Sequence, residues 1–144
     1  MTKTIVCGVD NSPTAAAAAR KAAELAVALN AELHLLSAYG KVESATVQVG
    51  SESILLSNDM EAERIAGAVA VDLRKEFPDL QVVPSASEGR AGEALVAAAK
   101  RLDADLIVVG NKRVQGIARV LGSIARDVAA QAPCDVYVAH THHG

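Results

Sequence analysis

The stretch ADLIVVGNKRVQGIARVLGSIARDVAAQAPCDVYVAH, residues 104–140, contains two apolar runs joined by a basic, glycine-containing loop and a helical pattern. The first run ends at Gly110. In the helical pattern Ile124 and Val128 stand four residues apart, and Pro133 stops the helix before the second run. A strand, a helix and another strand in this order predict parallel strands joined by a helical crossover.

The same alternation extends back to the N-terminus. Ser12 is placed to cap a helix that starts at Pro13, and Asn30 is a plausible stop for it. The segment 40–53 is polar and interrupted by Gly and Ser, so we expect a long loop there. Strands are expected over residues 4–9, 31–39, 80–87, 104–110 and 134–140, and helices over residues 13–29, about 57–77, 92–102 and 123–132.

The expected strands are nearly continuous apolar runs, not alternating ones. Such strands are covered on both faces, which predicts an α/β fold with an open, mostly parallel five-stranded sheet and helices on both sides. The 144 residues suffice for one domain, 1–144, with a sizeable core.

Composition excludes several function classes. Aromatic residues make up only 2% of the chain, so the stacking platforms of single-stranded nucleic acid binding are missing. The net charge of −3 argues against non-specific attraction to DNA or anionic membranes. Cys7 and Cys134 lie in apolar runs and are expected to be buried, inert thiols. We find no signal peptide pattern or membrane-spanning run and expect a cytoplasmic protein.

Two loops follow strands whose carboxyl ends meet at one edge of the predicted sheet: GVDNSP, residues 8–13, and GNKRVQGIARVLGS, residues 110–123. Open α/β sheets bind ligands at this edge. In the second loop, Gly110 would let the backbone approach a ligand, and the helix start Gly122-Ser123-Ile124 would offer N–H groups to an anion. Positive charge around this anion site comes from Lys112, Arg113 and Arg119.

These loops leave alternatives open. Asp10 either contacts a sugar or base, or holds a Mg²⁺ that bridges phosphates, or only helps to start the first helix. The second loop is either an anion site or an ordinary connection. Neither a Walker motif nor a dinucleotide-binding G-x-G-x-x-G is present.

Three segments carry a family resemblance: IVCGVDNSPTA (5–15), SEGRAGEALVAAAKRLDADLIVVGN (87–111) and RVLGSIARDVAAQAPCDVYVAHT (119–141). With them the whole chain resembles the universal stress protein family. The resemblance implies a Rossmann-like sheet with strand order 3-2-1-4-5, homodimers that often pair through the last strand, and, in many members, bound ATP or another adenine nucleotide.

In ATP-binding members the loop has Gly, two residues, Gly, nine residues, Gly and then Ser or Thr. Here Gly110 matches the first glycine and Gly122-Ser123 the closing pair. Arg113 replaces the second glycine, the following stretch is one residue shorter, and Gly116 is nearby. The candidate nucleotide-binding residues are Val9, Asp10, Ser12, Ser37, Ala38, Gly89, Gly110, Asn111, Arg113, Gly116, Gly122, Ser123 and Ile124, with Asp10 as the candidate Mg²⁺ ligand.

Other polar residues have simpler interpretations. We expect His140, His142 and His143 to belong to a frayed terminus, and His34 to be a satisfied strand residue. No general base is evident near the loop, so at most slow ATP hydrolysis is expected. Two hypotheses remain: a nucleotide-binding regulatory protein of the stress response, which holds ATP or cyclic AMP, and a nucleotide-free dimeric interaction protein of the same family.

Overall fold

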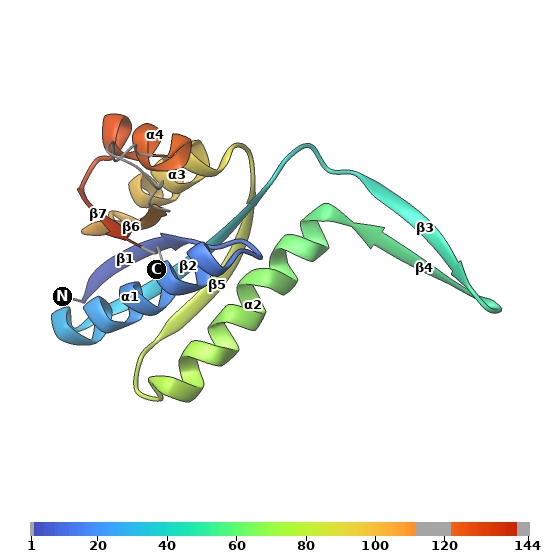
Figure 1. Cartoon of the computed structure of the whole chain (residues 1–144), viewed down its shortest axis with the longest axis horizontal. Coiled ribbons are helices and arrows are strands. Elements are labelled where there is room, and N and C mark those ends of the chain that lie inside the picture. The colour runs from blue at the N-terminus through green and yellow to red at the C-terminus, as the bar shows by residue number, and fades with distance from the viewer. Residues whose placement is uncertain (1, 112–121, 141–144) are drawn as a thin grey trace, which may run out of the picture.

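A computed structural model describes residues 2–111 and 122–140 of the chain. Figure 1 shows how its helices and strands are arranged. In chain order they are β1 (Lys3–Gly8), α1 (Pro13–Leu29), β2 (Ala31–Tyr39), β3 (Ser44–Val49), β4 (Glu52–Ser57), α2 (Asn58–Glu76), β5 (Val82–Glu88), α3 (Ala91–Leu102), β6 (Leu106–Asn111), α4 (Ser123–Gln131) and β7 (Asp135–His140).

The main sheet has the order β5-β2-β1-β6-β7, and every pairing in it is parallel. Counted among these five strands alone, this is the order 3-2-1-4-5. The predicted five-stranded parallel sheet and its strand order are therefore confirmed. The chain moves outward from β1 in one direction through β2 and β5, and in the other through β6 and β7, so the strand order reverses beside β1.

Helices cover both faces of the sheet, as the continuous apolar strands predict (Figure 1). Alternate residues of β1 divide between two cores: Ile5 and Cys7 pack under α1 and α2, whereas Val6 packs under α3 and α4. Full burial raises the pKa of the Cys7 thiol to about 12, and Cys7 is confirmed as a buried cysteine, whereas Cys134 is only partly buried. No helix in the described ranges is long and apolar enough to cross a membrane.

The first helix lies against the sheet on an alanine stripe. Small side chains let its backbone approach the strands closely, and five of them are fully buried or nearly so: Ala18, Ala19, Ala22, Ala23 and Ala26. Both ends are as predicted. The Oγ of Ser12 accepts a hydrogen bond from the Ala15 N–H at 3.1 Å, and Asn30 closes the helix in the left-handed conformation, with φ of 55°.

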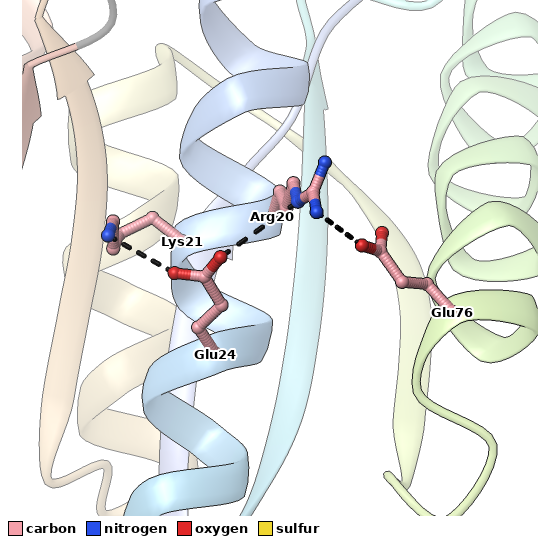
Figure 2. A network of polar contacts seen from close by, with 4 residues as sticks. All are labelled: Arg20, Lys21, Glu24 and Glu76. Atoms are coloured by element: carbon pink, nitrogen blue, oxygen red, sulfur yellow. Dashed lines mark ion pairs between the residues drawn. The ribbon is translucent and has the colours of Figure 1, made fainter.

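An ion-pair network joins α1 to α2 on the solvent side (Figure 2). Arg20 contacts Glu76 of α2 at 2.5 Å and Glu24 of its own helix at 3.9 Å, and Lys21 also contacts Glu24 at 3.1 Å. All four side chains are exposed to solvent, so water and salt screen these pairs. The network therefore contributes little to the stability of the fold.

The expected loop over residues 40–53 is wrong, because most of it forms a β-hairpin. β3 and β4 pair antiparallel as a separate two-stranded sheet that projects from the body of the protein (Figure 1). Gly50 has a φ of +63° in the connecting turn, a conformation that glycine adopts without strain. The apolar side chains of Ala45, Val47 and Val49 alternate with polar ones, which is the strand signal that the Gly and Ser residues obscured.

Candidate nucleotide site

A cavity of about 210 Å³ lies at the carboxyl ends of β1 and β6, where the strand order reverses. Both loops selected from the sequence therefore reach one site. Its walls come from β1, the turn into α1, β2, β6 and the starts of α3 and α4. They are formed by Gly8, Val9, Asp10, Ser12, Thr14, Ala15, Leu36, Ala38, Ala91, Leu95, Val109, Gly110 and Ile124.

The turn between β1 and α1 supplies the polar side of the cavity. Asp10 is exposed, and its Oδ1 accepts a hydrogen bond from the Ser12 N–H at 2.8 Å. Ser12 in turn caps α1, which begins at Pro13. Asp10 thus helps to start the helix, and it also lies on the cavity wall.

Gly110 has a packing role that differs from the one expected. It is the penultimate residue of β6, and a Cβ built on it would lie 3.1 Å from the Thr14 carbonyl oxygen and 3.2 Å from the Ala18 Cβ. Glycine at this position is needed for close contact between β6 and the first turns of α1. Gly110 also lines the cavity, so the position of α1 and the shape of the site depend on the same residue.

The start of α4 reaches the cavity through Ile124, whereas Asn111, Gly122 and Ser123 lie beside the cavity and do not line it. Buried Asn111, the last residue of β6, accepts a hydrogen bond from the Gly122 N–H on its Oδ1 at 2.7 Å. Ser123 and Ile124 then form the exposed first turn of α4. The first N–H groups of a helix have no acceptor within it and carry the positive end of its dipole, so this turn suits an anion. Asn111 acts by fixing where the turn begins.

Strand β2 brings only one of its two predicted residues to the cavity. Ala38 lines it, whereas Ser37 points to the opposite face and is buried under α1 and α2 together with its neighbours of the same parity. Gly89 does not line the cavity. Its φ is +128° and its N–H donates to the Tyr39 carbonyl at 2.8 Å, so this glycine shapes the entry to α3, whose first residue Ala91 does line the cavity.

Most of the wall residues that sequence reasoning missed are small or apolar. Leu36 and Val109 belong to the sheet face under α3 and α4, and Leu95 comes from α3 itself. The alternation of strand side chains would identify Leu36 and Val109 once the face of the sheet is known. The missed residues are Gly8, Thr14, Ala15, Leu36, Ala91, Leu95 and Val109.

Four basic or glycine residues proposed for the phosphate loop, Lys112, Arg113, Gly116 and Arg119, lie outside the described residues, as do His142 and His143. His34 is half-buried in β2 and contacts Glu32 through its Nε2 at 2.9 Å, which confirms it as a satisfied strand residue. His140 is the exposed last residue of β7 and pairs with Asn111, so the expectation of a frayed terminus is wrong for this residue.

In the ranges 2–111 and 122–140, no three His, Cys, Asp or Glu side chains cluster closely enough to hold a metal ion. Asp10 is the carboxylate on the cavity wall. Mg²⁺ is often bound by one or two carboxylates together with phosphate oxygens, so this carboxylate fits an ion that a nucleotide brings with it and does not fit a metal held by the protein alone.

Comparison with known proteins decides the family. The family model described as the universal stress protein family matches residues 1–140. The chain belongs to this family. Universal stress protein Rv1636 of Mycobacterium tuberculosis is 35% identical, with 96% of this chain and 97% of the relative covered. A universal stress protein of Thermus aquaticus is 33% identical over 94% of this chain and 97% of its own.

Solved structures of universal stress proteins share the fold. A universal stress protein in complex with cAMP is 29% identical, covers 97% of this chain and 98% of its own, and has a TM-score of 0.73. A universal stress protein from Archaeoglobus fulgidus shares the fold at 24% identity, with 96% of this chain and 98% of its own covered and a TM-score of 0.73. The nucleotide-containing relative thus matches this chain over nearly its full length.

Proposed function

We propose that this universal stress protein binds an adenine nucleotide in the cavity at the carboxyl edge of its sheet and acts as a homodimeric regulator of a stress response. The cavity carries the proposal, because it combines the reversal of strand order, the start of α4 and a carboxylate at one place. The 29% identical relative with bound cAMP supports an adenine nucleotide as the ligand.

The cavity walls suggest how such a ligand lies. Leu36, Ala38, Leu95 and Val109 offer an apolar surface for the base, and Asp10 stands beside it as an acceptor for a sugar hydroxyl or a partner for Mg²⁺. The phosphates would then face the first turn of α4. Binding of this kind needs no catalytic residue. The proposed role is therefore regulatory, in that the protein would act through whether its site is occupied.

The direct test is to denature the purified protein, identify any released nucleotide by mass, and titrate the stripped and refolded chain by calorimetry. ATP and cyclic AMP are compared, each with and without Mg²⁺. We expect saturable binding of at least one of them with one site per chain. A folded protein that neither releases nor binds an adenine nucleotide would contradict the proposal.

The absence of nucleotide release and binding would favour the second candidate, a nucleotide-free dimeric interaction protein. One observation favours this candidate: Arg113 stands where ATP-binding members have their second glycine. The proposed homodimer is common to both candidates. β7 is an edge strand of the main sheet, and Tyr137 on it is partly exposed, so pairing through this strand would extend the sheet across two chains.

Changing Asp10 to Asn separates its two roles. Asn can still accept the Ser12 N–H bond, so stability is expected to change by less than about 0.5 kcal/mol. The negative charge is lost, and with it the part of ATP affinity that depends on Mg²⁺, about tenfold. Calorimetry with and without Mg²⁺ measures this loss. If Asp10→Asn keeps the full Mg²⁺ effect, this carboxylate serves only the helix start.

A further inference from the structure

Helices α3 and α4 begin beside each other at the edge of the cavity. They lie side by side on one face of the sheet (Figure 1), and the first turn of each contributes a residue to the cavity wall, Ala91 from α3 and Ile124 from α4. The contact between the two helices is close, because a Cβ built on Gly92 would lie 2.8 Å from the Asp127 Cβ. The positive ends of both helix dipoles therefore lie in the same region.

Arg90 is the N-cap residue of α3, a position that arginine does not favour. An N-cap side chain stabilises a helix by accepting a hydrogen bond from an N–H group of the first turn, and the guanidinium has no acceptor atom. Arg90 makes no such bond. Its positive charge also stands at the positive end of the helix dipole, where acidic side chains are favoured. The stability of α3 therefore does not explain why this residue is an arginine.

The backbone and the sequence at this position both suit a serine. Arg90 has a φ of −70° and a ψ of 143°, an extended conformation like that of Ser12, which caps α1. Glu93 stands at the third helical position, so a serine at position 90 would complete the pattern Ser-x-x-Glu, in which the two side chains cap the helix start reciprocally. Residues that depart from such local preferences are expected mainly at functional sites, so a functional role for Arg90 is the better explanation.

The guanidinium of Arg90 is held only loosely. Its Nη2 lies 3.9 Å from the Asp127 Oδ2, which is beyond hydrogen-bond distance, and the Arg90 side chain is 76% exposed. An exposed ion pair of this length contributes little to stability. The other charged residues close to this pair in the sequence are Glu88, Glu93 and Arg126, and all three are exposed. The guanidinium can therefore turn toward a ligand without breaking its contact with Asp127 at the cost of a hydrogen bond.

The same guanidinium lies close to the first turn of α4. Asp127 follows Ser123 by four residues and Ile124 by three, so it neighbours both of them on the surface of the helix. About one helical turn, or roughly 5 Å along the axis, separates Asp127 from Ser123. An arginine side chain that reaches Asp127 also reaches an anion bound at the first-turn N–H groups. Arg90 therefore stands beside the place proposed for the phosphates.

We infer that Arg90 is a phosphate-binding residue of the nucleotide site, and that a phosphate at the first turn of α4 takes its guanidinium over from Asp127. This inference rests on the proposed nucleotide binding and adds to it a residue that selects for the phosphate group. The planar guanidinium donates two parallel hydrogen bonds to phosphate oxygens, an interaction stronger than its present contact with Asp127 at 3.9 Å. Arg90 thus favours nucleotides over nucleosides that have the same base and sugar.

The same substitution at the two ends of α3 tests this role, with urea unfolding and calorimetric titration of ATP as the measurements. Arg90→Ser removes the guanidinium and completes the cap, so we expect a higher urea midpoint together with ATP binding that is about tenfold weaker. Arg101→Ser, in the last turn of α3, removes the same charge about 17 Å away along the helix. There the charge favours the helix dipole and is screened from the site, so we expect a lower urea midpoint and a change in ATP affinity of less than about twofold.

Two further measurements identify the group that Arg90 binds. Arg90→Lys keeps the charge without the paired donors and is expected to lose only about threefold in ATP affinity. Adenosine has the base and the sugar without phosphates, so it should bind the parent and Arg90→Ser alike.

The outcomes separate this inference from the proposed function. If the parent binds ATP and Arg90→Ser binds it as tightly, or if adenosine affinity falls by the same factor as ATP affinity, the inference is wrong and nucleotide binding stands. A lower urea midpoint for Arg90→Ser would show that the arginine serves the helix and would also overturn the inference. If the parent binds no adenine nucleotide at all, both the inference and the proposed function fail.

Discussion

Replacing Gly110 with Ala is expected to lower the free energy of unfolding by about 1–3 kcal/mol, because the added Cβ forces β6 and α1 apart. The Cβ would stand 3.0 Å from the Thr14 Cγ2 and 3.1 Å from the Thr14 carbonyl oxygen, and the second of these is backbone that cannot rotate away. Denaturation by urea, followed by circular dichroism, measures the change. Since Thr14 and Gly110 both line the cavity, nucleotide affinity should fall as well.

Gly67→Ala is the matched control. Gly67 lies within α2, and a Cβ built on it would have no atom of another described element within 4 Å. The same chemical change there removes the cost of glycine in a helix and is expected to raise the free energy of unfolding by about 0.5–1 kcal/mol. The two variants should thus change stability in opposite directions. If Gly110→Ala is as stable as the parent, the contact between α1 and β6 does not require glycine.

The fold could be predicted from the sequence to the extent that it depends on local patterns. Continuous apolar strands, the Ser12 cap and the stop at Asn30 each act within a few residues, and each prediction is confirmed. Strand order depends on pairings between distant segments, which no local pattern records, so it came from the family resemblance. The hairpin could not be predicted for another reason, because two sequence signals conflict between residues 40 and 53. Gly and Ser favour a loop there, whereas the alternation of Val47 and Val49 with polar residues favours a strand.

The site could be located from the sequence but not described in detail. The rule for parallel sheets brought Asp10 and Gly110 to one edge, where they line a common cavity. The sequence does not tell which face of β2 turns toward that cavity, so Ser37 and Ala38 were treated alike although their side chains lie on opposite faces. Nor does the sequence distinguish a glycine that leaves room for a ligand from one that lets a helix pack closely. Gly110 lies beside both the cavity and α1.

Replacing Gly122 with Val is expected to reduce adenine nucleotide affinity by more than about 100-fold, which corresponds to roughly 2.7 kcal/mol or more. Gly122 is the N-cap of α4, directly before the first-turn N–H groups proposed to hold the phosphates. A branched side chain there would occupy the space that an anion needs to reach these groups. Calorimetric titration with ATP and with cyclic AMP measures the loss.

The fold should tolerate this change. Gly122 has a φ of −65°, which any residue adopts, and among the described residues its Cβ would meet the Asn111 Oδ1, at an ordinary 3.5 Å. Valine is a poorer N-cap than glycine, so a loss of up to about 1 kcal/mol of stability is expected. Gly40→Val is the matched control, since that glycine is exposed, lies outside the cavity walls, and in the part of the chain that the structure describes a Cβ built on it would have no atom within 4 Å beyond its chain neighbours. If Gly122→Val binds as tightly as Gly40→Val, the phosphates do not rest on α4, and a nucleotide in the cavity must be held from the β1–α1 turn instead.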